Sequence, residues 1–121
     1  MAGEHAADDR DLTIRDWHAH FYFDADEAEE AGAVARALHA ALGVPMGRVH
    51  TRPVGPHPRG SCQMTIDRQR LIAALEWLTA HRGRFTIFLH PNTGDDLADH
   101  TAHMMWMGPS ETLDTSQFVR R

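Results

Sequence analysis

The chain has 121 residues, a formal net charge of -5, 42% hydrophobic residues and 24% charged residues. This composition is ordinary for one globular domain, and the acidic balance argues against a nucleic-acid partner, which normally meets a basic surface. No apolar run approaches the length that crosses a bilayer, and the first residues lack the apolar stretch of a signal peptide, so no membrane partner is expected. Cys62 is the only cysteine, which excludes an internal disulfide and favours a reducing, cytoplasmic location.

The first third of the chain predicts an arm, a strand and a long helix. Residues 1–15 are polar and acidic, and we expect them to form a flexible arm in front of a single domain at 16–121. Residues 16–23, DWHAHFYF, are rich in aromatic side chains and predict a strand. Residues 25–42 are rich in alanine, acidic in the first turn and followed by glycine and proline, which predicts a helix.

The rest of the chain predicts three more strands and a second helix. Strands are expected at 48–54, 61–67 and 84–90, where runs with strand-forming residues are bounded by turn residues. Residues 68–82 predict an amphipathic helix, because leucines recur on one of its faces. The sequence beyond the last strand is loop-rich, with a short helix or strand expected within 100–107.

The element order β-α-β-β-α-β is typical of the ferredoxin-like pattern in the α+β class. It predicts a four-stranded antiparallel sheet with two helices on one face. The other face of such a sheet is bare unless something covers it. We therefore expect a homodimer, as in a dimeric α+β barrel.

Histidine is the unusual feature of the composition, with ten copies in the chain. Side chains alternate between the two faces along a strand. In the first strand the apolar alternates should face the helices, which leaves His18, His20 and Tyr22 on the open face. The same alternation predicts that His50 and Arg52, from the second strand, and His90, from the last strand, lie on that face.

The connections between strands are expected to bring histidines together. The first strand should begin at the sheet end where the last strand finishes, and the loop between the second and third strands is expected at that same end. The segment after the last strand starts there too, and it carries Asp99 and His100. On this topology, one end of the open face should hold His18, His20, His57 and His90.

A cluster of imidazoles without cysteine suits Fe(II), Mn(II), Zn(II) or Cu(II). Two or three histidine ligands leave open positions for a substrate and dioxygen, and a further histidine can transfer protons near neutral pH. Structural explanations stay open beside this one. His57 lies between two prolines and fits a rigid turn, His90 fits the end of a strand, and Arg52 fits a plain exposed arginine.

Several stretches of the chain share the pattern of one protein family. They are Trp17–Phe23, Gly55–Pro58, Leu89–Asp96, Asp99–Thr101 and Trp106–Gly108. Together they resemble the DOPA 4,5-dioxygenase family, a small family of extradiol ring-cleaving enzymes. The stretch HPNTGDD with the following DHT is the most specific part, GPHP is moderately specific, and the histidine pair of the first strand is weak alone.

The resemblance implies a ferredoxin-like, often dimeric protein that cleaves a catechol such as L-DOPA. The implied partners are a small catechol and dioxygen, and the implied cofactor is a non-haem iron(II). Zinc or another divalent metal can occupy the same kind of histidine site after expression.

The resemblance also implies roles for individual residues, since the family's motif histidines correspond to His20, His57, His90 and His100. We expect the first three of these to bind the metal. We expect His100, with Asp99 behind it, to transfer protons, and His18 to support the site. Tyr22 and Arg52 are expected to meet the substrate, with Arg52 holding a carboxylate through a bidentate pair.

Two functions of other classes remain open at this point. One is a non-catalytic metal- or ligand-binding module on a dimeric α+β scaffold, and the other is a structural dimer with incidental histidines. Metal analysis separates the structural dimer from the rest, and oxygen uptake with catechols separates the enzyme from the binding module.

Overall fold

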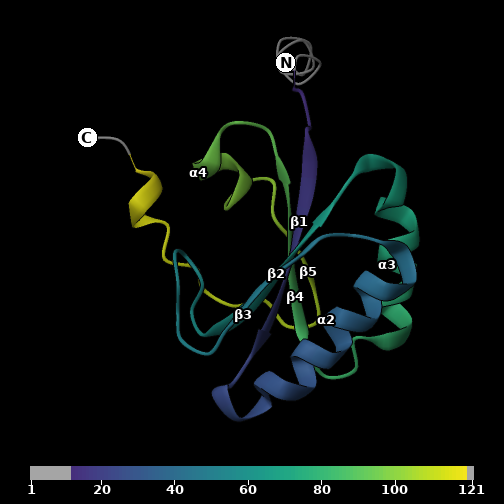
Figure 1. The fold of residues 1–121 in the computed structure, drawn as a ribbon. Coiled ribbons are helices and arrows are strands. Elements are labelled where there is room, and N and C mark those ends of the chain that lie inside the picture. The colour runs from purple at the N-terminus through teal and green to yellow at the C-terminus, as the bar shows by residue number, and fades with distance from the viewer. Residues whose placement is uncertain (1–11, 120–121) are drawn as a thin grey trace.

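The structure is a computed structural model that describes residues 12–119, and its centre is an antiparallel sheet (Figure 1). The sheet has five strands in the order β2-β3-β1-β4-β5. The strands are β1 (Asp16–Phe23), β2 (Met46–His50), β3 (Gly60–Ile66), β4 (Thr86–Asn92) and β5 (Met105–Met107). Residues 1–11 of the expected arm lie outside the described residues. The end of that arm already joins the sheet, because the Arg15 backbone N–H donates to the Asn92 carbonyl at 2.9 Å.

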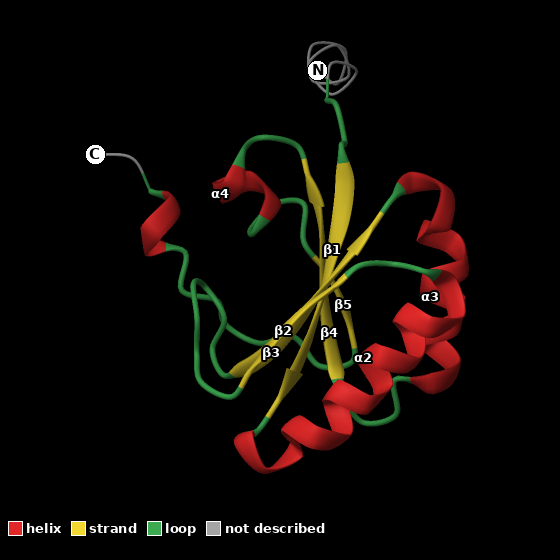
Figure 2. Ribbon diagram, viewed as in Figure 1, coloured by secondary structure: helices red, strands yellow, loops and turns green. Residues whose placement is uncertain are grey.

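Two long helices cover one face of the sheet, as the sequence predicts and as Figure 2 shows. The acidic residues Glu29 and Glu30 lie in the first turn of the longer helix, and Gly43 ends it with a φ of 73°, a left-handed conformation that glycine adopts without strain. No helix within residues 12–119 is long and apolar enough to span a membrane. The helices are α2 (Ala28–Leu42) and α3 (Leu71–His81), each preceded by a 3-10 turn, η1 (Ala25–Glu27) and η2 (Arg68–Arg70).

The hydrophobic core lies between the helices and the sheet. From β1 it receives the alternating residues Ala19, Phe21 and Phe23, all fully buried. Ile87 and Leu89 of β4 join the same core. The predicted alternation is therefore confirmed, and the residues between these positions point to the opposite, open face.

Three features of the sheet differ from the sequence-based expectation. The sheet has a fifth strand, β5, which pairs with Ile87–Leu89 of β4. β2 begins earlier than expected and ends at His50, so Arg52 lies beyond the strand in the loop. β4 continues through Pro91 and Asn92. The proline is tolerated because β5 does not reach that far along β4.

The loop between β2 and β3 is also at the other end of the sheet. Phe23, the last residue of β1, pairs with Gly60, the first residue of β3. The loop before Gly60 therefore starts where β1 ends, not where β1 begins. It curls back across the open face, which is why His57 still comes close to His20, with ring centroids 4.3 Å apart.

The C-terminal part of the chain covers part of the open face. It carries α4 (Asp96–Asp99) and η3 (Ser116–Phe118), which lie on the side of the sheet away from the helices (Figure 2). The Phe118 ring stacks on His100 with a centroid separation of 4.4 Å. The argument for a dimer from a bare face is thus weaker than the sequence suggested, and the homodimer stays a prediction.

Candidate metal centre

Three histidines meet where β1 and β4 pair. His18 lies directly opposite His90 in the strand register, and His20 is the next residue on the same face of β1. One ring nitrogen from each histidine lies within 4.8 Å of the others. His20 and His90 are buried, with 3% and 1% of their surfaces exposed, so the sheet itself builds a compact group of imidazoles.

The closest nitrogens in this group are the Nε2 atoms of His20 and His90, 3.2 Å apart. Two imidazole nitrogens bound to one ion at about 2.1 Å lie roughly 3.0–3.4 Å apart for bond angles of about 90–109°. The observed separation is in that range. The donor set therefore fits a divalent metal that prefers nitrogen ligands.

Backbone carbonyls fix the orientation of two imidazoles. His90 Nδ1 lies 2.8 Å from the Pro91 carbonyl oxygen, and His100 Nδ1 lies 2.7 Å from that of Asp96. A carbonyl only accepts hydrogen bonds, so each Nδ1 carries the proton and each Nε2 keeps its lone pair. This is the arrangement that outer hydrogen bonds impose on metal-binding histidines.

His57 is held by a different kind of group. Its Nδ1 lies 2.7 Å from the hydroxyl of Tyr22, which is fully buried. A hydroxyl donates or accepts, so this partner permits a proton on either nitrogen of His57. His57 stands beside His20 but outside the group formed by His18, His20 and His90.

His18 has a polar neighbour on the adjacent strand. The Gln63 side-chain amide nitrogen lies 3.2 Å from His18 Nε2. That amide donates to His18 Nε2 when this nitrogen is unprotonated, so a metal bound through Nε2 would replace this hydrogen bond. Because one ring nitrogen of His18 lies within 4.8 Å of those of His20 and His90, His18 is closer to the centre of the site than the supporting position expected from the sequence.

Burial keeps the clustered imidazoles neutral. It lowers the pKa of His20 far below the ordinary value, and the neighbouring rings of His57 and His90 lower it further. It lowers the pKa of His90 to about 4, and also that of His57 to about 4. Neutral imidazole is the form that binds a metal, so the clustered histidines are in the metal-binding protonation state near pH 7.

Asp99 does not orient His100, contrary to the sequence-based expectation. Its carboxylate accepts hydrogen bonds from the Thr93 backbone N–H at 2.8 Å and the Thr93 hydroxyl at 2.7 Å, and it contacts His103 Nδ1 at 3.1 Å. Burial raises the pKa of Asp99, but these hydrogen bonds outweigh that effect and hold its pKa below the ordinary range. Asp99 therefore orders the turn after β4, while the Asp96 carbonyl orients His100.

Aromatic side chains form an apolar wall beside the histidines. Phe88 lies 5.5 Å from the His20 ring and 4.9 Å from the Trp106 ring, measured between centroids. Tyr22 stacks near Phe88 at 6.2 Å. The indole N–H of Trp106 is buried and has no hydrogen-bond partner among the described residues. This wall excludes water from one side of the cluster.

A pocket of about 230 Å³ opens next to the cluster. Its inner end is formed by His20 and His57, and its other walls come mainly from β2 and β3. The remaining lining residues are Gly47, Arg48, His50, Val54, Ser61 and Gln63. A small ligand in this pocket would touch the imidazole cluster directly.

Residues 17–117 match the Dopa 4,5-dioxygenase family. The chain belongs to this family. The resemblance inferred from the sequence motifs is thereby confirmed.

Two curated proteins and one solved structure are similar to this chain. A DOPA 4,5-dioxygenase from Amanita muscaria is 34% identical over 113 residues, covering 86% of this chain and 50% of that protein. An uncharacterized 21.2 kDa protein from Botryotinia fuckeliana is 32% identical over 81 residues, covering 60% and 44%. The crystal structure of a candidate dioxygenase from Nostoc punctiforme is 34% identical with a TM-score of 0.72, covering 84% of this chain and 88% of that one. The chain thus spans about half the length of the curated relatives that it matches.

One pocket residue of this Dopa 4,5-dioxygenase family member, Arg48, was not singled out by the sequence reasoning. Arg48 and His50 line the pocket beside the cluster, whereas the sequence favoured Arg52. Arg52 is exposed and lines an adjacent hollow of about 280 Å³, which shares His50 and Val54 with that pocket. The strand expected at 48–54 includes Arg48, but side-chain alternation alone does not distinguish Arg48 from Arg52, whereas the position of His50 on the open face was correctly predicted.

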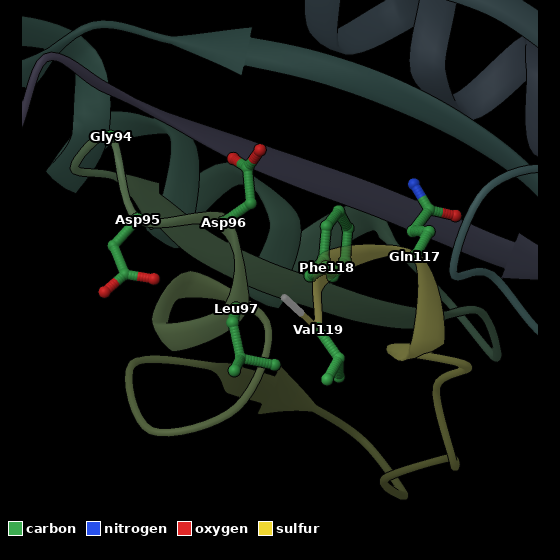
Figure 3. Close-up of a pocket in the computed structure, with 7 residues that line it drawn as sticks. All are labelled: Gly94, Asp95, Asp96, Leu97, Gln117, Phe118 and Val119. Carbon is green, nitrogen blue, oxygen red and sulfur yellow. The ribbon is translucent and has the colours of Figure 1, made fainter. Parts of the chain in front are cut away.

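A larger hollow is lined by residues of the C-terminal part of the chain, from Gly94 to Val119. It has a volume of about 530 Å³ and lies between α4 and η3, as Figure 3 shows. Asp95 and Asp96 line one side, and Leu97, Phe118 and Val119 contribute apolar surface. The Asp95 carboxylate caps α4 by accepting from the Ala98 backbone N–H at 3.1 Å. Because this hollow does not reach the three clustered imidazoles, it is not part of the candidate centre.

The remaining described histidines on the helices have structural partners. His39 Nδ1 lies 2.7 Å from the Val44 carbonyl oxygen. His81 Nδ1 lies 2.9 Å from the Trp77 carbonyl oxygen. Both belong to the helix layer, whereas His5 lies outside the described residues.

Proposed function

We propose that the chain is an extradiol ring-cleaving dioxygenase that acts on a catechol with a non-haem iron(II). The observation that supports this most directly is the 3.2 Å approach of the His20 and His90 Nε2 atoms in a buried cluster that opens into a ligand-sized pocket. Membership of the Dopa 4,5-dioxygenase family supports the same reaction class.

His18, His20 and His90 are the ligand set that the geometry favours, because one nitrogen of each lies within 4.8 Å of the others. Bound iron(II) would supply a redox-active Lewis acid that acts on the catechol oxygens and dioxygen together. Three neutral ligands leave positions open for both reactants. Both atoms of dioxygen enter the ring-opened product, so the reaction needs no external reductant.

His57 is the imidazole that we assign to proton transfer. It lies on the pocket wall next to His20, within reach of a catechol hydroxyl. Its lowered pKa means that it is neutral at pH 7 and available to accept the proton that the catechol loses on binding. The Tyr22 hydroxyl, which accepts or donates at Nδ1, accommodates both protonation states of the ring.

His100 lies on the far side of His90, with ring centroids 4.3 Å apart. Its free Nε2, fixed by the bond from Nδ1 to the Asp96 carbonyl, makes it a second group able to exchange a proton with the site. Phe118 covers its other side. His100 therefore serves the reaction from outside the ligand set, as the sequence motifs implied.

The test is anaerobic reconstitution of tag-free protein with Fe(II), followed by metal analysis and oxygen-uptake measurements on a panel of catechols. We expect about one iron per chain and a yellow ring-fission product. His20→Ala and His90→Ala should lose the iron, whereas His81→Ala, which removes a helix-surface imidazole, should keep it.

The outcomes separate the competing functions. Iron bound without oxygen uptake on any catechol would favour a non-catalytic binding module. Iron content unaffected by loss of His20 and His90 would exclude the cluster as a metal site. His18→Ala and His57→Ala assign the third ligand, because the variant that loses iron identifies it.

A further inference from the structure

We propose that the pocket selects catechols whose side chain ends in a carboxylate and carries no amino group, and that Arg48 holds that carboxylate. This inference rests on the proposed function for the position of the ring, and it adds the charge class of the substrate. It also predicts that this chain disfavours DOPA, the amino-acid substrate that the family name suggests.

The first step is the shape of the pocket. Its buried end is formed by His20, and its outer part includes Arg48, which is exposed, and His50, which is partly exposed. Its volume of about 230 Å³ is below the roughly 300–1,000 Å³ of sites that hold drug-sized ligands. It suits one aromatic ring with a short chain that points from the cluster toward Arg48.

The second step is the charge of the lining. Arg48 is the one permanently charged side chain among the described residues that line the pocket, and none of them is acidic. Within residues 12–119 no carboxylate forms an ion pair with Arg48. An arginine without a protein partner at the mouth of a small pocket matches a ligand carboxylate, which it can bind through two parallel hydrogen bonds.

The third step concerns the acidic side chains near the open face. Glu111 is bound by Arg59 through two hydrogen bonds of 3.0 and 2.7 Å, and Asp24 is bound by the same guanidinium at 3.0 Å. The Asp99 carboxylate is already hydrogen-bonded to Thr93 and His103. A substrate ammonium group would therefore lie beside the Arg48 guanidinium with no carboxylate among the described lining residues to offset the repulsion between the two cations.

The local sequence of β2 builds this arrangement. The register between β2 and β3 shifts between Met46 and Val49, and both of these residues pack toward the core. Gly47 then lines the pocket with no side chain. A Cβ there would lie 3.2 Å from the Gln63 carbonyl oxygen, so the glycine keeps open the space between the cluster and Arg48.

The experiment compares three catechols that differ by one group at a time. They are 3-(3,4-dihydroxyphenyl)propionate, L-DOPA, which adds an amino group to it, and 4-ethylcatechol, which lacks the carboxylate. The dissociation constants are measured by anaerobic calorimetry on Zn(II)-loaded protein, and kcat/KM is measured on Fe(II)-loaded protein. We expect the propionate to bind about tenfold more tightly than either of the others.

Arg48→Gln should weaken propionate binding about tenfold and leave 4-ethylcatechol unchanged, which also shows that the variant is folded. Arg36→Gln, on α2 at the helix-covered side, is the matched control and should change neither. L-DOPA binding as tightly as the propionate would overturn the selectivity. If Arg52→Gln weakens propionate binding and Arg48→Gln does not, the assignment of Arg48 as the carboxylate-binding residue is wrong.

Failure of the proposed function gives a different result. Zinc-loaded protein that prefers the propionate, with no oxygen uptake by the iron-loaded protein, refutes the dioxygenase and supports the ligand selectivity. Oxygen uptake with equal kcat/KM for all three catechols supports the dioxygenase and refutes the selectivity.

Discussion

Tyr22 and His57 are joined by a 2.7 Å hydrogen bond between the phenol oxygen and Nδ1, although 35 positions separate them in the chain. The bond connects the central strand to the loop that curls over the open face. Burial raises the pKa of Tyr22 above its ordinary value, so the phenol keeps its proton. The pair gives His57 a partner that adapts to either ring tautomer, unlike the carbonyls that hold His90 and His100.

Removing this hydroxyl tests the role of His57. In Tyr22→Phe we expect kcat to fall about tenfold or more, because a mispositioned proton-transfer group loses part of its contribution. The free energy of unfolding should fall by only about 1 kcal/mol. Metal content should be unchanged. Steady-state kinetics measures kcat, and metal analysis measures the metal content. An unchanged kcat would count against proton transfer by His57.

The stability of the metal-free protein should decrease as the pH falls from about 6.5 to about 4. The pKa of His90 is lowered from 6.5 to about 4 by burial, so between these values the unfolded chain binds a proton that the folded chain does not. The free energy of unfolding then falls by up to about 1.4 kcal/mol per pH unit for each such histidine. Above pH 6.5 both states are neutral and the curve is flat.

Urea unfolding at a series of pH values measures this dependence. His90→Gln should flatten the curve, because the variant removes one of the groups whose pKa shifts on folding. His81→Ala should follow the unaltered protein. A curve that stays level between pH 6.5 and 4.5 would contradict the burial of neutral imidazoles.

The Arg59–Glu111 ion pair should hold the C-terminal segment on the open face. Its two hydrogen bonds measure 3.0 and 2.7 Å, and the side chains are 31% and 22% exposed. Glu111→Gln should cost about 1 kcal/mol and increase amide hydrogen exchange in residues 108–119. Glu76→Gln, on the exposed surface of α3, should leave exchange in this segment unaltered. Equal exchange in the two variants would show that the pair does not hold the segment.

Gly60 should tolerate no side chain. A Cβ at this position would lie 2.9 Å from the carbonyl oxygens of Phe23 and His50, and both oxygens belong to strand backbone. We expect Gly60→Ala to destabilise the protein by about 2–3 kcal/mol, measured by thermal unfolding. Gly32→Ala is the control, because alanine favours the helix and the nearest atom to its Cβ is the flexible end of Arg36 at 3.3 Å. Destabilisation by Gly32→Ala as large as by Gly60→Ala would reject this steric explanation.

The sequence predicts the local geometry of the site better than its connections. Alternation along β1 correctly separates Phe21 from His20 and Tyr22, because strand periodicity is a property of the backbone alone. The end of the sheet at which the β2–β3 loop lies depends on strand order, and the expectation was wrong there. His57 nevertheless reaches the cluster, because its loop folds back over the face.

Arg48 and β5 show a second limit. The register shift in β2 depends on how Met46 and Val49 pack against the helices, and single-sequence patterns do not encode such packing. β5 has only three residues and is stabilised by pairing with β4, so propensity alone does not distinguish it from a loop. The third member of the histidine group, His18, likewise follows from its register opposite His90.

The imidazole cluster contains no carboxylate ligand among the residues that meet at the join of β1 and β4. An electroneutral ligand set leaves the full double charge of a divalent ion uncompensated in a buried setting, which is electrostatically expensive. A catechol that arrives as an anion removes that cost. Ion and substrate should thus strengthen each other's affinity by the same factor, since linkage between two sites is reciprocal. The protein would then retain its ion most tightly while the organic ligand is in place.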